Sequence, residues 1–245
     1  MKYECGNGFV STKWAKVDAG LDFYLVCPGP SLSEVDFDLR GRGRKIVGVN
    51  TSYPKVIPDI WVGMDKINCY DRNLLWEPFP KVWRGNYWNL DFHGKLLKDF
   101  PETYFASVSK LGEGETMFNR RAHEVNFAWY KHTLGVALHL MVWMGAKTIH
   151  FVGNDLGGDK DYFDDRKLTD YQRSYNRRLY GQQIKFLKEF MELGVKNNIR
   201  CVSCTPHSPI NAFMQFIPIK DAIESTERRH SYSGDIQVKH ALDAE

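Results

Sequence analysis

Short apolar runs alternate with longer helical segments along most of this chain. The runs lie near residues 23–27, 45–49, 59–63, 147–152 and 199–203, and weaker candidates begin at residues 81 and 103. Runs of this length fit buried strands, and the segments between them are long enough to carry the chain back across a sheet. The pattern predicts an α/β fold: a Rossmann-like, mainly parallel sheet flanked by helices.

Two of the segments between the runs have clear helical character. Residues 133–145 are apolar on nearly all faces, which predicts a buried helix with Thr133 as N-cap and Gly145 as the residue that ends it. Residues 182–195 are amphipathic and predict a helix with one buried face.

The same pattern sets the expected domain limits. Residues 22–222 carry the alternating runs, residues 1–21 form a mixed N-terminal extension, and residues 223–245 form a polar, charged C-terminal tail. Residues 159–180 are charged, rich in tyrosine and begin without apolar periodicity. They predict a small lid, with a solvated charged loop as the alternative.

The sharpest break in the pattern follows the first run, at the Cys-Pro-Gly-Pro-Ser sequence of residues 27–31. Prolines cannot continue a central strand, Gly29 permits a close approach of the backbone, and Ser31 with Glu34 has the spacing of a capping box. Strand, tight loop and helix start would together aim backbone N–H groups at an anion, most often a phosphate. A plain turn with a helix cap is the alternative.

Polar residues also follow other apolar runs. Asn50 ends the second run, Asp65 the third, and Asn154 with Asp155 the run at 147–152. Because the carboxyl ends of parallel strands meet at one edge of a sheet, several polar side chains should converge there. The residues expected in this pocket are Ser31, Asn50, Asp65, Thr133 and Asp155, with Asn154 as a further binding residue.

The composition of the chain indicates which class of ligand it binds and in which cellular compartment it is expected. Aromatic residues make up 14% of the 245, and such side chains line pockets for rings and sugars as well as cores. The net charge of +3 suits an anionic ligand without demanding nucleic acid. The odd count of five cysteines, the lack of an apolar signal segment and the absence of about 18 consecutive apolar residues predict a soluble cytoplasmic protein with reduced thiols.

Four motifs occur in an order that resembles a known group of proteins. They are Cys-Pro-Gly-Pro-Ser-Leu at 27–32, Val-Gly-Val-Asn at 47–50, Thr-Leu-Gly-Val-Ala at 133–137 with Gly-Ala-Lys-Thr-Ile-His-Phe-Val-Gly-Asn-Asp-Leu at 145–156, and Cys-Thr-Pro-His-Ser-Pro-Ile-Asn-Ala-Phe at 204–213. The set resembles the Campylobacter-type bacterial sialyltransferases and their wider relatives, the Maf-like flagellin-glycosylation proteins and the hydroxymethylpterin diphosphokinase-like proteins. The likeness covers most of residues 22–217.

The resemblance implies a nucleotide site. The positions that would hold or line it are Gly29, Pro30, Ser31, Asn50, Thr133 and Gly135. Lys131 stands where the sialyltransferases carry an arginine. Tyr162 falls in the stretch where they place tyrosines against the donor phosphate.

The sequence departs from the sialyltransferases at their general base. Their histidine lies just ahead of the helix that matches residues 182–193, and this chain has Tyr175 there. This departure argues against sialic acid as the transferred sugar. It leaves Asp155 or His207 as the candidate general base, with Tyr162 as a further catalytic candidate.

A second departure concerns metal. Asp65 stands where the sialyltransferases have asparagine. An acidic residue at this position is more similar to the Maf-like and diphosphokinase-like relatives. Asp65 and Asp155 are two carboxylates at strand ends, and Mg²⁺ binds one or two carboxylates together with substrate phosphates. We therefore expect a site for Mg²⁺ or Mn²⁺ beside the phosphate of the donor.

Together these observations predict a transferase that uses a nucleotide-activated donor, first of all a glycosyltransferase that moves a sugar from a nucleotide sugar to a hydroxyl. Diphosphokinase-type phosphoryl transfer from ATP and a non-catalytic nucleotide- or sugar-binding protein are the alternatives. The acceptor stays open between a glycan, a protein, a lipid headgroup and a modified nucleic acid base, and so does homo-oligomerisation.

Overall fold

The computed structural model describes residues 8–10, 14–92, 94–119, 126–157, 160–164 and 166–242. Its strands are β1 Gly8–Phe9, β2 Asp22–Val26, β3 Arg44–Val49, β4 Ile60–Gly63, β5 Lys81–Arg84, β6 Asp91–Phe92, β7 Lys95–Leu96, β8 Thr103–Ser109, β9 Asn126–Ala128, β10 Thr148–Val152, β11 Arg200–Ser203 and β12 Gln215–Phe216. Its α-helices are α1 Thr133–Met144, α2 Asp170–Lys196 and α3 Ile219–Leu242. Every strand predicted from an apolar run is present, the two weaker candidates included.

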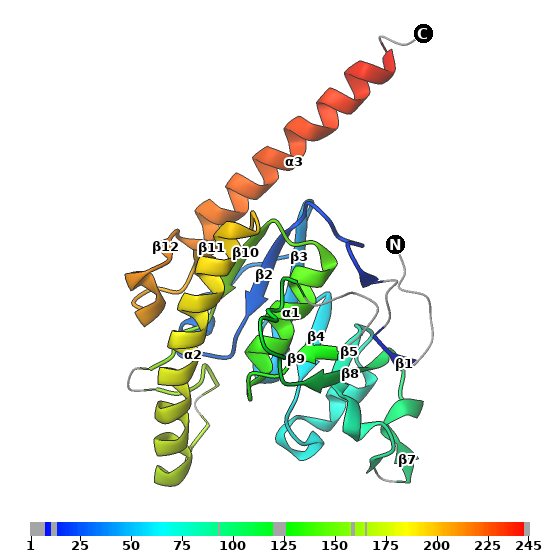
Figure 1. The fold of residues 1–245 in the computed structure, drawn as a ribbon, viewed down its shortest axis with the longest axis vertical. Helices are drawn as coiled ribbons and strands as arrows, with labels where there is room; N and C mark the ends of the chain where they lie inside the picture. Colours follow the sequence, from blue (N-terminus) through cyan, green and yellow to red (C-terminus); the bar gives the residue numbers. More distant parts are fainter. Residues whose placement is uncertain are drawn as a thin grey trace.

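Ten of these strands form one sheet in the order β1-β8-β5-β4-β3-β2-β10-β11-β12, with β9 beside β8. All neighbouring pairs in it are parallel, while β6 and β7 form a separate antiparallel pair. Figure 1 shows helices packed against this sheet. The predicted α/β fold with a Rossmann-like parallel sheet is therefore confirmed.

The strand order reverses beside β2. Moving outward from β2, the chain places β3, β4, β5 and β8 on one side and β10, β11 and β12 on the other. Open α/β sheets bind ligands at such a reversal, outside the carboxyl ends of the strands. The turn after β2 and the turn after β10 therefore mark the expected position of a site.

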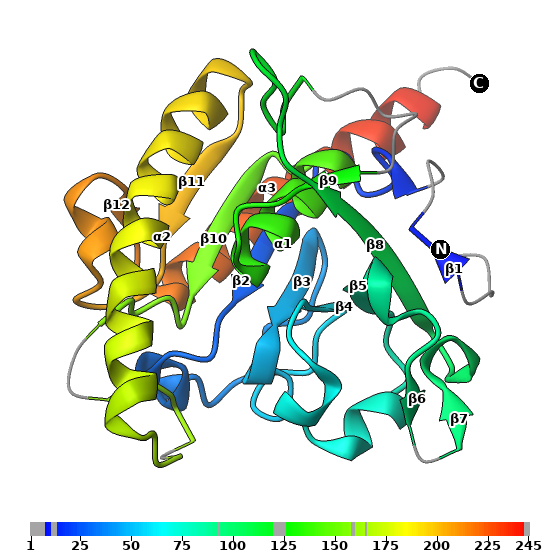
Figure 2. The same ribbon diagram turned by 60° about the horizontal axis from the view of Figure 1, so that its bottom comes forward.

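Alternate residues of β2 pack into different cores, as the two-residue period of a strand requires. Phe23 and Leu25 pack in the core that contains α1 and α2. Tyr24 and Val26 pack in the core that contains the beginning of α3 and Leu32 from the turn after β2. Figure 2 shows α1 and α2 on one face of the sheet and α3 behind it. Both faces are covered, which explains why the central strands are largely apolar.

The two predicted helices exist, but their beginnings differ from expectation. The N-cap of α1 is His132 rather than Thr133, because the His132 ring accepts a hydrogen bond from the third residue of the helix. Gly145 ends α1 as predicted, with a φ of 94°. α2 begins at Asp170 rather than at residue 182, behind a capping box on Thr169. Its first turns bury none of their side chains, so no apolar period marks them in the sequence.

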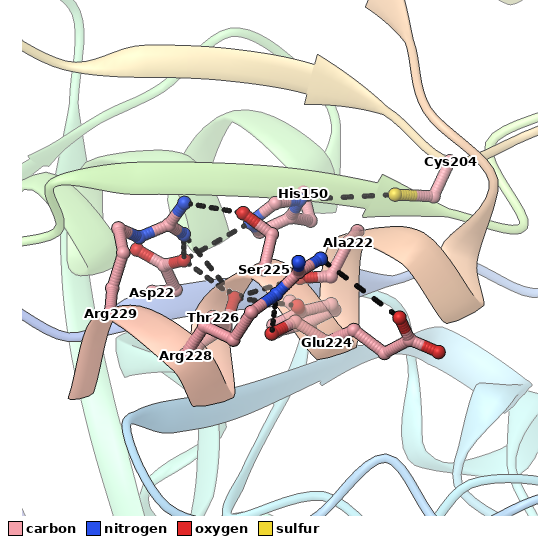
Figure 3. A network of polar contacts seen from close by, with 10 residues as sticks. Asp22, His150, Cys204, Ala222, Glu224, Ser225, Thr226, Arg228 and Arg229 are labelled. Atoms are coloured by element: carbon pink, nitrogen blue, oxygen red, sulfur yellow. Dashed lines mark hydrogen bonds and ion pairs between the residues drawn. The ribbon is translucent and has the colours of Figure 1, made fainter. Parts of the chain in front are cut away.

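The segment expected to be a polar tail forms most of α3. Thr226 of this helix has 0% exposure, and Figure 3 shows the polar network around it. Thr226 Oγ1 donates to Asp22 Oδ2 at 2.7 Å, Arg229 also binds that oxygen, and His150 Nε2 lies 3.4 Å from it. Residues 243–245 lie outside the described part of the chain.

Asp22 is 3% exposed, so its charge depends on these partners. Burial alone would raise the pKa of its carboxyl group. The hydrogen bonds from His150 and Thr226 and the charge of Arg229 outweigh burial, and they hold the pKa of Asp22 well below its usual range. This network fastens α3 to the start of β2.

No helix among the described residues combines the length and the apolar character that crossing a membrane requires.

Candidate functional site

A cavity of about 230 Å³ lies at the carboxyl ends of β2, β3, β4 and β10. The N-terminus of α1 and the first turns of α2 complete its walls. Of the residues predicted from the sequence, it is lined by Gly29, Asn50, Asp65, Lys131, Thr133, Asn154, Asp155 and Tyr162. Four of the five residues expected to converge therefore meet at one cavity.

The remaining predicted residues lie beside this cavity. Pro30, Ser31 and His207 line a neighbouring cavity of about 320 Å³, which shares Asp155 and Tyr162 with the first. The two spaces thus meet at one carboxylate and one phenol. Gly135 lines neither of them; its N–H donates to the ring of the helix N-cap.

The loop after β2 binds a carboxylate of the chain itself. Ser31 Oγ donates to Asp155 Oδ2 at 2.9 Å, and the Ser31 N–H lies 3.3 Å from both carboxylate oxygens. The Gly29 N–H donates to the carbonyl of Gly153, and the Leu32 N–H donates to that of Gly29. The proline between them has no N–H. The loop amides that were expected to face a phosphate are therefore engaged within the protein.

The same contacts correct the predicted helix cap. The turn after Gly29 is a short 3₁₀ helix, Pro30–Glu34, and no side chain caps it. Ser31 lies inside this turn rather than at its N-cap, and its hydroxyl is used by Asp155. The spacing of a capping box was therefore misleading here.

Gly29 is needed because of close packing. A Cβ at this position would lie 2.2 Å from Asp155 Oδ2 and 2.5 Å from the carbonyl oxygen of Gly153. We expect Gly29→Ala to lower the free energy of unfolding by about 1–3 kcal/mol, the usual cost of overpacking. Urea denaturation measures this change. The matched control is Gly181→Ala in α2, where the added methyl group meets nothing within 4 Å and should stabilise the helix. Equal effects of the two substitutions would contradict the prediction.

Asp155 is the residue best placed for acid–base chemistry. Desolvation by burial raises its pKa, and the hydrogen bonds from Ser31 oppose this shift. A carboxylate with a raised pKa holds a proton more readily than one in water, as a general base requires. His207, the other candidate, is exposed and lines only the neighbouring cavity.

A buried tyrosine holds the ends of β3 and β4 together. Tyr70 OH donates to Asn50 Oδ1 at 3.3 Å and accepts from the Asp65 N–H at 3.3 Å. The carbonyl of Asn50 also accepts a hydrogen bond from Trp61 Nε1 at 2.6 Å. Desolvation raises the pKa of Tyr70 well above its usual value, so the phenol stays protonated. Asn50 and Asp65 therefore have fixed positions at the cavity.

Several residues that line the cavity have strained backbone conformations. Three non-glycine residues that line the cavity have left-handed backbones, with φ of 53° at Asn50, 64° at Lys131 and 50° at Leu156. Asparagine tolerates this conformation, but for other residues it costs roughly 1–2 kcal/mol. Such strain persists where the surrounding structure imposes it, and it clusters at functional sites.

Asn154 supplies a buried donor that has no acceptor. Its main chain is fixed, because its N–H donates to Thr205 Oγ1 at 3.0 Å and its carbonyl accepts from Ser208 Oγ at 2.7 Å. The residue is only 3% exposed, and no acceptor for its Nδ2 lies in the described part of the chain. An unpaired buried donor costs about 1–3 kcal/mol. A ligand oxygen that reached Nδ2 would remove that cost.

Tyrosines from α2 and the preceding segment add hydroxyl groups to the wall. Tyr162, Tyr175 and Tyr180 line the cavity, and Tyr180 OH lies 3.4 Å from Asp161 Oδ1. Burial raises the pKa of Tyr162, so its phenol is a donor at neutral pH. The segment that was predicted as a lid thus reaches the cavity, partly through the first turns of α2.

His132 lines the cavity and was not expected from the sequence. Its Nδ1 accepts a hydrogen bond from the Gly135 N–H at 3.0 Å, and its ring packs against Phe186 with ring centroids 4.9 Å apart. A Cβ at Gly135 would lie 2.9 Å from the Tyr130 ring and 3.2 Å from the His132 ring, so the glycine leaves room for both rings. The available signal was the histidine directly before the threonine at the predicted helix start. A more common N-cap residue at Thr133 concealed it.

The carboxylates that line the cavity do not make a metal site by themselves. Asp65, Asp155 and Asp161 all line the cavity. Within the described ranges, no group of three histidine, cysteine, aspartate or glutamate side chains has the geometry to hold a metal ion. Desolvation raises the pKa of Asp65 as well as that of Asp155, so both carboxylates would be stabilised by a nearby cation. The pair fits Mg²⁺ only if a ligand supplies further oxygens.

Comparison with known proteins found similarity to solved structures, two of which are described here. The chain matches no protein-family model and no curated protein sequence. It is similar to the sialyltransferase CstII from Campylobacter jejuni in complex with a substrate analogue, CMP-3FNeuAc, with 17% identity, a TM-score of 0.48, and coverage of 81% of this chain and 86% of the other. It is also similar to the sialyltransferase CST-II in complex with a trisaccharide acceptor and CMP, with 16% identity, a TM-score of 0.46, and coverage of 80% and 86%. Similarity at this level transfers neither activity nor site residues.

Proposed function

We propose that the chain is a glycosyltransferase that binds a nucleotide sugar in the cavity at the carboxyl ends of the strands. The observation that carries this proposal is the buried, unpaired Nδ2 of Asn154 at the point where the strand order reverses. A group of this kind binds an acceptor oxygen of a ligand, and the reversal is where open α/β sheets bind nucleotides. The ordered sequence motifs supply the expectation that the ligand is a nucleotide-activated donor.

The residues around the cavity suit the separate tasks of glycosyl transfer. Lys131, Asn154 and Tyr162 offer a cation and two donors for the phosphate, whose charge grows as the bond to the sugar breaks. Asp155 would take the proton of the acceptor hydroxyl, whose oxygen then bonds to the anomeric carbon while the nucleotide leaves with the bonding electrons. Because Asp155 also lines the neighbouring cavity, that cavity is the proposed entrance for the acceptor.

A ligand panel tests this proposal. Thermal unfolding is measured with CMP, UMP, UDP, GDP, ATP and the corresponding sugar nucleotides, starting with CMP because a solved relative binds it. A ligand at about 100 times its Kd adds roughly 2.7 kcal/mol of stability. The stabilising sugar nucleotide should then be hydrolysed slowly without acceptor. Turnover of ATP to AMP would instead identify a diphosphokinase, and binding without either reaction would identify a binding protein.

We further propose that Mg²⁺ or Mn²⁺ binds between Asp65, Asp155 and the phosphate of the donor. This proposal predicts that the cation and the nucleotide bind together. Since Asp65 and Asp155 supply two carboxylates and the described residues supply no third ligand in place, Mg²⁺ alone should leave the melting temperature unchanged. Mg²⁺ or Mn²⁺ together with a nucleoside diphosphate should raise it further than the nucleotide alone, and EDTA should reverse the increase. The control is Asp65→Asn, which should lose the increment due to the metal. Equal stabilisation by nucleotide in EDTA and in Mg²⁺ would contradict the cation site.

A further inference from the structure

The N-terminus of α1 opens into the cavity. Thr133 and Leu134 are the first two residues of this 12-residue helix, and both line the cavity. The first N–H groups of an α-helix have no acceptor within the helix, and neither of these two donates to another described residue. The aligned peptide dipoles of α1 also place positive potential at this end.

The N-cap residue presents a third donor at the same place. His132 Nδ1 accepts the Gly135 N–H at 3.0 Å, so Nδ1 carries the lone pair and the neutral ring carries its proton on Nε2. Burial lowers the pKa of His132 to about 4, so the ring stays neutral at physiological pH. Nε2 makes no hydrogen bond to another residue in the described part of the chain. A neutral ring fixed in this way donates a hydrogen bond and does not accept a proton.

Asn154 is a second residue of this cavity with an unused hydrogen-bond donor. This donor is the unpaired, buried Nδ2 described above. The other candidate for an anion site, the turn after β2, already holds the carboxylate of Asp155. Lys131, next to the N-cap, is the basic residue among those that line the cavity.

We infer that the phosphate of the nucleotide binds at the N-terminus of α1, where His132 donates a hydrogen bond to it through Nε2–H. The amides of Thr133 and Leu134, Lys131 and the amide group of Asn154 complete the phosphate site. This inference rests on the proposed function and names the part of the cavity that binds the phosphate. It also excludes His132 as the general base, because neither ring nitrogen is free to accept a proton.

Histidine NMR tests the inference on the intact protein. In protein labelled with ¹⁵N-histidine, His132 and His139 should both show the Nε2–H tautomer at pH 7, because His139 Nδ1 likewise accepts a backbone N–H, that of Ala128 at 2.8 Å. Titration with inorganic pyrophosphate or CMP should shift the His132 signals. His139 does not line the cavity and should stay unchanged. Unshifted His132 signals at saturating CMP, or a protonated Nδ1, would overturn the inference.

A substitution separates phosphate binding from helix capping. His132→Ser keeps a good N-cap for α1 and removes the Nε2–H donor. The affinity for CMP and for pyrophosphate should fall about 10- to 100-fold, as expected when a hydrogen bond to a charged group is lost. Full affinity of a folded His132→Ser variant for both would overturn the inference. The proposed function fails separately, if no sugar nucleotide is bound or turned over while pyrophosphate still shifts His132.

Discussion

Replacing Asp155 with asparagine is expected to lower turnover of the sugar nucleotide by about 10²- to 10⁴-fold, the usual contribution of a general base. The reason is its position between the two cavities, with a raised pKa and both oxygens held by Ser31. The variant should still bind the nucleotide, because the donors that face the phosphate are unchanged. Initial rates and titration of the product nucleotide measure the two effects separately.

The pH dependence gives this prediction a matched control. Turnover should rise with pH through the pKa of Asp155, because only the carboxylate accepts a proton. The hydrogen bonds from Ser31 lower that pKa, so Ser31→Ala should move the acid limb of the profile to higher pH and leave the plateau rate nearly unchanged. If Asp155→Asn keeps turnover within about threefold while His207→Gln abolishes it, the base is His207 and the assignment to Asp155 is wrong.

Replacing Arg229 with methionine is expected to lower the free energy of unfolding by about 1–2 kcal/mol, less than the cost of breaking a fully buried ion pair, because the Arg229 side chain is 44% exposed and solvent screens its charge. Asp22 would keep the contacts with Thr226 and His150 but lose its cationic partner, while its side chain is only 4% exposed. The control is Arg228→Met on the same helix, because the Arg228 side chain is 73% exposed and its Nη2 lies 4.0 Å from Glu224 Oε2. An exposed pair contributes at most about 1 kcal/mol.

The pH dependence of stability follows from the same carboxylate. The pKa of Asp22 is lower in the folded state than in the unfolded state, so its contribution is complete above the unfolded value of about 3.9 and is lost as the pH falls toward the folded value. The wild type should therefore lose stability below about pH 4, and Arg229→Met should show a flatter acid limb. Urea denaturation between pH 2 and 7 measures this. Equal losses for the Arg228 and Arg229 variants would contradict the proposed role of the network.

Apolar periodicity was enough to predict seven strands of the sheet and the buried helix, but not the short strands β1, β9 and β12. β2, β3 and β10 are buried on both faces over most of their length, so their sequences are largely apolar, as is typical of central strands. α3 and the start of α2 were not predicted, because they bury few apolar side chains. α3 is fastened by Asp22, whose two partners on this helix, Thr226 and Arg229, lie more than 200 residues further along the chain. No local pattern reveals such a contact.

The candidate site was predictable in position but less so in its contacts. Polar residues after parallel strands marked Asn50, Asp65 and Asp155 correctly as neighbours of one cavity. The loop at residues 27–31 was expected to bind an external anion. Its partner is Asp155, and sequence spacing cannot show which of two converging groups occupies an anion site. His132 was missed for a similar reason, since its role depends on the left-handed backbone of Lys131 and on packing against α2.

The central claim is that a nucleotide binds in this cavity, and Asn154→Leu tests it most directly. Asn154 Nδ2 is buried without a partner, so removing it should leave the ligand-free protein at least as stable as the wild type. The affinity for the nucleotide selected by the panel should nevertheless fall about 10- to 100-fold, because a hydrogen bond to the charged ligand is lost. Isothermal titration of both proteins with that nucleotide, beside their melting temperatures, gives the answer. Undiminished affinity in a folded Asn154→Leu variant would contradict the assignment of this cavity as the nucleotide site.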